Sequence, residues 1–436
     1  MLTLQMQNLN NLLKFAIQNQ KNKKFKIAEE TYKKILKLNP TNIIALYNMG
    51  ILSSQFNKID EAIIFYKKVI NINPKLEDVH NNLGLLYYKA GDEKRATDCY
   101  EKAININPNY SNAHNNLGVV NAGKGKYEIA INYYLLSLSF NPNHKETLRN
   151  LLIALCYFNS TKNNQIINAH NSLKKFRIKF KLEDFLENKN IKKLLKFSSS
   201  ILSSLEQNKI LLDNYETQIH RRNSINLNCE RHHKVFGELK IIPSTCFSCF
   251  KIQIEPKSVL DLIKLFFIFN DFNFKNNNWR KCMVETRSNV TGTYKGLIYC
   301  SSLEEVNNIL SEIQPILQKF LNYKFNIKRG CSEFYSIYND FKELDNKNDN
   351  YMNYDKDWKK LEEDFDTSQG ISNKKYTNSI SGFSLLDFIT INNWLNYAKI
   401  INDNSYKDVL TEFYHSNLVL SKIADQIEFR KKQLAG

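Results

Sequence analysis

The stretch that decides the fold of the first third of the chain is residues 77–110, EDVHNNLGLLYYKAGDEKRATDCYEKAININPNY. Its Asn-Pro pair recurs every 34 residues, at Pro40, Pro74, Pro108 and Pro142. Alanine and tyrosine keep the same interval, at Ala28, Ala62, Ala96 and Ala130 and at Tyr32, Tyr66, Tyr100 and Tyr134. A fixed period over four copies indicates one supersecondary unit stacked on itself.

Each unit is predicted to be a helix, a turn and a second helix. In residues 43–76, apolar residues recur at helical spacing over 46–52 and 62–70, with a polar turn between them. Asn-Pro ends the second helix because proline lacks an amide donor and disfavours helix in the residue before it. A glycine inside each of three first helices suggests a close approach to the small alanines of the partner helix, at Gly50, Gly84 and Gly118.

The pattern resembles the tetratricopeptide repeat (TPR). One copy carries the signature of that family at Leu83, Gly84, Tyr87, Ala96, Tyr100, Ala103 and Pro108. Other copies depart from it, with Ala16 for the glycine and with Ser53 and Asn121 for the first aromatic residue. The resemblance implies an α-helical solenoid over residues 1–158, made of repeats 9–42, 43–76, 77–110 and 111–144 and a capping helix at 145–158.

One column of the repeat is a candidate peptide-binding surface. Asparagine stands two residues before the glycine position, at Asn48, Asn82, Asn116 and Asn150. The resemblance places this column on the concave face, where similar asparagine ladders bind an extended peptide, and a carboxamide matches a peptide unit as both donor and acceptor. The neighbouring candidates are Asn81, Asn115 and Arg149. The alternative is that the asparagines only reflect a chain rich in Asn, Lys and Ile.

Composition sets broad limits. A chain of 436 residues predicts two to three domains, and its formal net charge is +17. The excess is spread along the chain, which favours a solvated basic surface over a dedicated nucleic-acid site. No signal peptide is evident at the N-terminus, and eight cysteines without an export signal indicate reduced thiols or metal ligands. A cytoplasmic protein is expected, with no membrane span.

The rest of the chain is predicted to be a helical linker region at 159–235, an α+β domain at 236–340, a polar flexible segment at 341–380 and C-terminal helices at 381–436. Within the α+β domain the order is strand, helix, strand, strand, helix, strand, the ferredoxin-like βαββαβ pattern with strand order 4-1-3-2. The predicted elements are strands at 250–254, 281–285, 294–300 and 323–328 and helices at 257–269 and 302–321.

The predicted strand order brings most cysteines to one end of the sheet and suggests a metal site. Its candidate ligands are Cys229, His232, Cys246, Cys249, Cys282 and Cys300, with Cys331 as a substitute. Cys-x2-His before Cys-x2-Cys suits a structural zinc, and a thiolate-only set suits an iron–sulfur cluster. The alternatives are isolated buried thiols, since cysteine packs as a small apolar residue, and a redox or catalytic cysteine.

These observations predict a scaffold or adaptor that binds an extended peptide through TPR repeats and has a C-terminal Cys-rich domain. Two alternatives are an enzyme of unknown class, such as a transferase, targeted by its repeats, and an RNA-binding adaptor. The RNA alternative rests on Lys295-Gly296-Leu297-Ile298-Tyr299, which keeps part of the third-strand motif of an RNA-recognition motif. The scarcity of phosphate-binding loops and of nucleophile motifs argues against an enzyme.

Overall fold

The structure is a computed structural model of the chain, and it divides into two compact units, Met1–Ala154 and Leu155–Gly436. It describes residues 2–177, 181–208, 210, 216–221, 223, 227–287, 290–344, 351–369, 378–379, 382–410, 421 and 423–435. The first unit is called the repeat unit below and the second the α+β unit, and each is described by itself.

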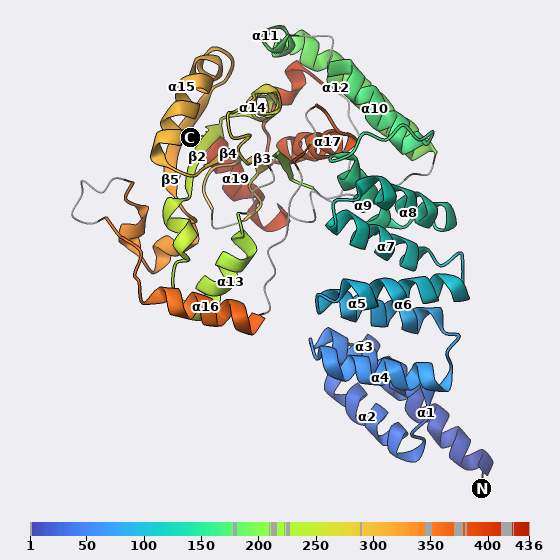
Figure 1. The fold of residues 1–436 in the computed structure, drawn as a ribbon. Coiled ribbons are helices and arrows are strands. Elements are labelled where there is room, and N and C mark those ends of the chain that lie inside the picture. Colours follow the sequence, from blue (N-terminus) through green and yellow to red (C-terminus); the bar gives the residue numbers. More distant parts are fainter. Residues whose placement is uncertain are drawn as a thin grey trace. The chain divides into compact units, whose positions relative to one another are not determined.

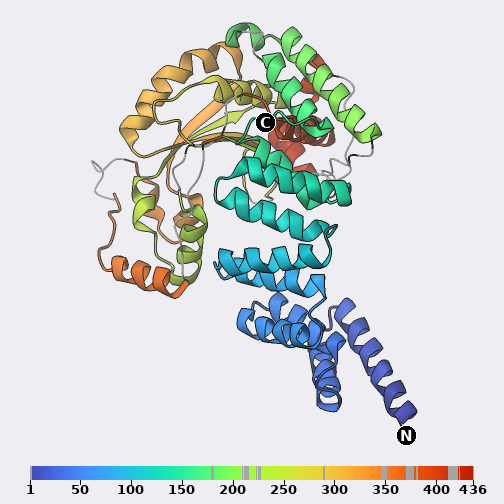
Figure 2. The ribbon, with the colours of Figure 1, turned by 45° about the vertical axis from the view of Figure 1, so that its right-hand side comes forward.

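The repeat unit is a stack of antiparallel helix pairs (Figures 1 and 2). Its second helices end one residue before each Asn-Pro, as the proline spacing predicts. The helices are α1 (Leu2–Lys21), α2 (Phe25–Leu38), α3 (Ile43–Gln55), α4 (Ile59–Ile72), α5 (Glu77–Lys89), α6 (Glu93–Ile106), α7 (Ser111–Gly123), α8 (Tyr127–Phe140) and α9 (Lys145–Leu155).

The glycines of the first helices make room for a tyrosine ring of the paired helix. A Cβ added at Gly84 would lie 2.6 Å from a ring carbon of Tyr100, closer than real contacts allow. Gly50 and Gly118 face Tyr66 and Tyr134 in the same way. The close approach predicted from the sequence is therefore present, but its partner is the buried tyrosine column and not the alanines.

The α+β unit contains one five-stranded sheet, and its helices and strands are interleaved along the chain (Figure 1). The strands are β1 (Gln218–Arg221), β2 (Phe250–Pro256), β3 (Arg280–Val284), β4 (Tyr294–Cys300) and β5 (Tyr323–Arg329). The helices are α10 (Gln165–Arg177), α11 (Leu182–Phe185), α12 (Asn188–Gln207), α13 (Cys229–Leu239), α14 (Val259–Asp271), α15 (Leu303–Phe320), α16 (Trp358–Gln369), α17 (Leu385–Ile400) and α19 (Ile427–Ala435).

The strand order is β1-β3-β4-β2-β5, and every neighbouring pair is antiparallel. The last four of these strands lie in the predicted order 4-1-3-2, and their bounds agree with the predicted strands within two residues. The sequence did not predict β1, which adds an edge strand beside β3 from the region assigned to a helical linker. Four residues with three polar side chains give too short a pattern to indicate a strand.

The two faces of the sheet differ in chemistry. One face is apolar and packs against α14 and α15, with Ile252, Ile254 and Ile298 fully buried. Gly296 on this face leaves no room for a Cβ beside Leu265 of α14. Alternate residues point to opposite faces of a strand, so the residues between these face the other side, where lysine recurs on four strands.

The core of the α+β unit also contains a buried polar network. The Arg221 guanidinium and the Asp387 carboxylate form an ion pair at 2.7 Å, with both side chains less than a tenth exposed. Asp387 caps α17 through a reciprocal capping box with Ser384. His170 is 1% exposed, accepts a hydrogen bond from the Leu385 amide at 3.3 Å and has no partner at Nε2 among the described residues.

Two other sequence predictions bear on the C-terminal region. The polar segment 341–380 contains α16, a helix that the sequence analysis did not predict. Its stretches 345–350 and 370–377 lie outside the described residues, as does 411–420 in the predicted last helix. All eight cysteines are described and none forms a disulfide. Within the described residues, no helix combines the length and apolarity that a membrane span requires.

Candidate functional site

The repeat unit presents the asparagine column, made of Asn48, Asn82, Asn116 and Asn150, on its first helices. All four side chains are half-buried. Three of them donate a hydrogen bond from Nδ2 to the preceding repeat. Asn82 donates to Tyr47 Oη at 3.0 Å, Asn116 to Asn81 Oδ1 at 2.8 Å and Asn150 to Asn115 Oδ1 at 3.0 Å.

The hydrogen bonds fix the rotamers of the column and use only part of its bonding capacity. A carboxamide has two N–H donors and an oxygen with two lone pairs, so one donated bond leaves groups for a ligand. Asn48 instead donates to the Ile44 carbonyl of its own helix, because the equivalent residue of the preceding repeat, Leu13, has no side-chain acceptor. The predicted neighbours Asn81 and Asn115 are buried within this ladder, whereas Arg149 is exposed.

A second column lies beside the first and was not noticed in the sequence. Aliphatic residues follow the asparagines at i+3, which places them on the same helix face. None of them is buried, and Leu85 is 36% exposed. The aliphatic column is Ile17, Ile51, Leu85, Val119 and Ile153. The 34-residue interval would have revealed it, since all five positions are in register.

The α+β unit has a pocket on the polar face of its sheet, with a volume of about 390 Å³. Its floor is formed by β1 to β5, and its walls are the start of α13, residues 285–287 with Val290, and residues 330–333. Its charged residues are Lys251, Lys281, Lys295, Lys328, Arg287, Glu285 and Glu333, with His233, Cys229 and Cys331 at the walls. This set is called the sheet-face pocket below.

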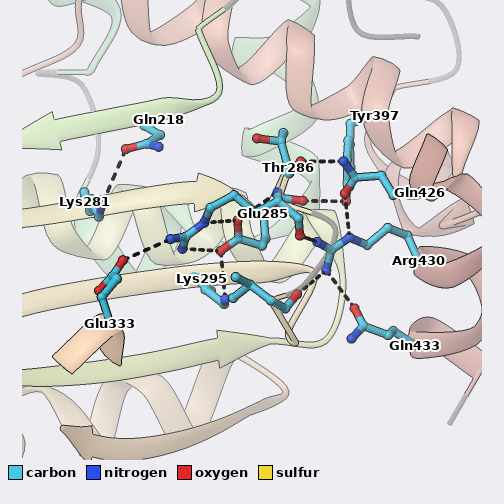
Figure 3. Close-up of polar contacts among 12 residues, drawn as sticks. Gln218, Lys281, Glu285, Thr286, Lys295, Glu333, Tyr397, Gln426, Arg430 and Gln433 are labelled. Atoms are coloured by element: carbon cyan, nitrogen blue, oxygen red, sulfur yellow. Dashed lines mark hydrogen bonds and ion pairs between the residues drawn. The ribbon is translucent and has the colours of Figure 1, made fainter. Parts of the chain in front are cut away.

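One end of the sheet-face pocket is organised around Glu285, which is 1% exposed (Figure 3). Its carboxylate accepts hydrogen bonds from Lys295 Nζ and from Arg287 Nε and Nη2, each at 2.9 Å. Burial alone would raise the pKa of Glu285, but the hydrogen bonds from Arg287 and Lys295 lower this pKa to about 2. This end of the pocket is therefore electrostatically satisfied.

The segment that carries Arg287 is held in place by the C-terminal helix α19 (Figure 3). The buried Arg430 guanidinium donates to the carbonyls of Arg287 at 2.6 Å and of Val290 at 3.0 Å. Gln426 donates to the carbonyl of Thr286. A wall of the pocket is thus positioned by residues about 140 positions away in the sequence.

The opposite end contains the thiol of Cys331. Lys251 Nζ lies 3.1 Å from Cys331 Sγ, and His233 hydrogen-bonds the same sulfur. Burial would raise the pKa of the Cys331 thiol, but the His233 hydrogen bond and the Lys251 charge bring this pKa below its ordinary value. Gly330, at φ +57°, turns the chain after β5 so that Cys331 enters the pocket.

The middle of the sheet-face pocket is positively charged, and two of its lysines have no directly paired carboxylate among the described residues. Lys251 and Lys328 are directly opposite each other on β2 and β5, an unfavourable placement for like charges. Neither Lys281 nor Lys328 forms an ion pair with a carboxylate of the described residues. Burial lowers the pKa of both lysines, and the Lys251 charge lowers it further for each. Nearby carboxylates oppose this shift only in part, Glu255 and Glu333 for Lys328 and Glu285 for Lys281.

The six predicted metal ligands do not converge. Cys246 Sγ lies 3.3 Å from His232 Nδ1, and Cys249 and Cys229 lie near Cys331. Cys282 and Cys300 instead sit in the strands, with side chains on the apolar face. The register pairs Cys282 with Gly296 of β4, four residues before Cys300. The two thiols therefore lie at different positions along the strands.

Burial raises the pKa of the thiols of Cys246, Cys282 and Cys300, which disfavours the thiolate that a metal needs. Among the described residues, no group of three or more His, Cys, Asp or Glu side chains is arranged to hold a metal ion. The zinc or iron–sulfur site therefore gains no support from the geometry and stays a prediction, which metal analysis of reduced protein tests.

Comparisons with known proteins concern the repeat unit. Tetratricopeptide repeat models match residues 31–64, 77–110 and 99–132, and a TPR repeat model matches residues 55–91. No curated protein matches the chain. Among solved structures, MamA protein is similar at 23% identity over 34% of this chain and 80% of that chain, with a TM-score of 0.31.

Two further similar structures are of TPR proteins that bind peptides. YrrB, a TPR protein with an unusual peptide-binding site, has 21% identity over 33% of this chain and 74% of that chain, at a TM-score of 0.29. The first TPR of Spaghetti, bound to an HSP90 peptide, has 24% identity over 26% of this chain and 89% of that chain, at a TM-score of 0.25. From the family matches, the chain carries tetratricopeptide repeats, which span residues 31–132.

Proposed function

We propose that the repeat unit is a docking platform that binds an extended segment of a partner protein along the asparagine and aliphatic columns. The observation that carries the proposal is the in-register ladder of four half-buried carboxamides, three of them held by a hydrogen bond to the preceding repeat. Such a ladder presents donors and acceptors at regular intervals, as an extended peptide backbone does.

The aliphatic column supports the same function. Its side chains lie one helical turn from the asparagines and remain partly exposed, so they offer apolar contacts beside the polar ladder. Hydrogen bonds to the peptide backbone do not depend on its side chains, and the apolar contacts are shallow. The expected partner is therefore an extended, moderately apolar segment that is bound with low sequence specificity. The chain then acts as an adaptor or scaffold, and the α+β unit supplies a second activity.

The hydrogen bonds of the ladder also permit a purely structural role, and an experiment on the full-length protein separates the two. Linear peptides selected from a random library on the wild-type chain are measured against Asn82→Ala/Asn116→Ala. The matched control is Asn71→Ala/Asn105→Ala, two exposed asparagines with the same spacing on α4 and α6. We expect the ladder variant to lose at least about tenfold in affinity, since it lacks two carboxamides that would hydrogen-bond the peptide backbone.

Two measurements complete this test. N-methylation of a central peptide amide should weaken binding more than scrambling the peptide sequence, because the ladder contacts the backbone. Circular dichroism must show that the ladder variant remains folded. Equal affinities for wild type, ladder variant and control would reject the platform and leave the asparagines as staples between repeats.

For the α+β unit, we propose membership of the ferredoxin-like folds, on the support of its βαββαβ connectivity and its β3-β4-β2-β5 strand order. An RNA-binding surface of the RNA-recognition type gains less support. Phe250, the aromatic residue of β2, lies on the apolar face and is 7% exposed, so it is not available to stack a base.

A further inference from the structure

The sheet-face pocket has more positive charge than the protein itself compensates. Five lysine or arginine side chains line it and only two glutamates do. Even with Cys331 counted as a thiolate, two positive charges are left. Glu285 and Glu333 are engaged by Lys295 and Arg287, and Cys331 is engaged by Lys251, so the excess lies at Lys281 and Lys328.

The sheet fixes the positions of these two cations relative to Lys251. Lys251 on β2 is directly opposite Lys328 on β5 and lies two strands from Lys281 on β3, and each of the two lysines feels the Lys251 charge. The hydrogen-bond partner of Lys281 Nζ is neutral, Gln218 Oε1 at 3.5 Å. An anion between the lysines would reduce their mutual repulsion and favour the charged forms of Lys281 and Lys328, which burial disfavours.

The shape and lining of the pocket limit what the anion can be. A volume of about 390 Å³ lies within the range of small-molecule sites. The walls formed by Cys229, His233 and residues 285–287 bound the polar face of the sheet, so the site is a pocket and not an open track for a long strand. Met283, Leu297 and Tyr299 add an apolar part to its lining.

We propose that the sheet-face pocket binds a small organic dianion, a phosphate monoester or a dicarboxylate, whose charges are met by Lys251, Lys281 and Lys328. Cys331 lies at the edge of this site, bonded to Lys251, so a bound dianion is within reach of a nucleophilic side chain. The proposal concerns the α+β unit alone and does not depend on peptide binding by the repeats.

The thiol of Cys331 provides a direct readout on the full-length, reduced protein. Its alkylation is followed by mass spectrometry with iodoacetate, which is anionic, and with iodoacetamide, which is neutral and of similar size. Cys229 lines the same pocket, and burial raises the pKa of its thiol, so it serves as the internal comparison. We expect iodoacetate to be favoured at Cys331 relative to a free thiol in solution.

Ligand protection needs no substitution. Phenyl phosphate, succinate and acetate are added at equal ionic strength. Phenyl phosphate or succinate should slow the alkylation of Cys331 by at least about threefold more than acetate does, because a dianion cancels both uncompensated charges. The two dianions separate a phosphate-type from a dicarboxylate-type ligand. Equal slowing by all three salts would overturn the proposal.

Charge-removing variants identify the residues. Lys281→Met and Lys328→Met keep most of the aliphatic stem and should each lower the iodoacetate to iodoacetamide rate ratio at Cys331 by about threefold. The matched control is Lys324→Met, an exposed lysine of β5 that does not line the pocket. An unchanged iodoacetate to iodoacetamide rate ratio in both pocket variants would contradict the proposed site. Tight binding of single-stranded RNA that Lys281→Met abolishes would contradict it as well.

Discussion

The repeat unit and the α+β unit are stabilised by different kinds of contact. In the repeat unit, the same tyrosine fills the space over the same glycine in three successive repeats, at Gly50, Gly84 and Gly118. In the α+β unit, single polar contacts join residues far apart in the sequence, such as Arg221 and Asp387. A contact that recurs can be lost once with limited effect, whereas a single buried ion pair has no substitute.

The largest effect is expected from breaking that ion pair. Arg221→Met leaves the Asp387 carboxylate buried without its cation and also removes a hydrogen bond to Asn270. The free energy of unfolding of the α+β unit should fall by about 3–5 kcal/mol. Urea unfolding followed by tryptophan fluorescence measures this unit selectively, because Trp279, Trp358 and Trp394 all lie in it.

The control for this prediction lies in the repeat unit. Arg95 pairs with Asp92 at 2.6 Å on the surface, so Arg95→Met should leave both unfolding transitions where they are. If Arg221→Met moved the circular dichroism transition of the repeats as much as the fluorescence transition, the two units would not be separate in stability and the comparison would be wrong.

The next effect is a pH dependence confined to the α+β unit. Burial, together with the charge of Lys174, lowers the pKa of His170 from 6.5 to about 4. The unfolded chain therefore binds more protons than the folded one between pH 6.5 and 4. Stability from neutral His170 is complete above pH 6.5 and is lost as the pH falls toward 4, by about 2 kcal/mol at pH 5.

His170→Gln tests this, since a glutamine oxygen can still accept from the Leu385 amide but does not titrate. The fluorescence-detected stability of the variant should change less between pH 7 and pH 5 than that of the wild type. An identical change in both proteins would show that His170 is accommodated in its charged form, contrary to its unpartnered Nε2.

The same contrast explains how much the sequence could predict. The helices of the repeats follow from a fixed interval, and four strands of the sheet follow from alternation, because both signals are local. The sheet-face pocket requires Lys251, Lys281 and Lys328 to meet, and their meeting depends on the pairing of strands 30 to 77 residues apart in the sequence. Each lysine alone looks like an ordinary solvated position.

The prediction of a metal site gained no support for a related reason, because the positions of the cysteines also depend on how distant strands are arranged. Strand order correctly placed Cys246, Cys249, Cys300 and Cys331 toward one end of the sheet, but it says nothing about which face a side chain occupies. The register put Cys300 on the apolar face, whereas the turn at Gly330, after the end of β5, brings Cys331 to the polar face. Two thiols at the same end of a sheet can therefore be separated by its thickness.

The smallest effect is expected from introducing into one repeat a helix cap that the preceding repeat already has. Asp92 caps α6, with its carboxylate accepting from the Arg95 amide at 2.9 Å. The equivalent residue one repeat later is Lys126, which has nearly the same backbone angles, φ −84° and ψ 61° against −88° and 78°, and no side-chain cap. Lys126→Asp should therefore stabilise the repeat unit by about 0.5–1 kcal/mol, by accepting from the Ile129 amide.

Lys126→Ala separates the cap from the loss of a positive charge at the helix N-terminus. Urea unfolding by circular dichroism should show a gain for aspartate and a smaller or no gain for alanine, with the tryptophan transition unchanged in both. Equal free energies of unfolding for the two variants would mean that the cap of one repeat does not form at the equivalent position of the next, even though the backbone angles there are similar. The two units would then differ less than their contacts suggest, because context beyond the repeat would also govern the stability of the repeat unit.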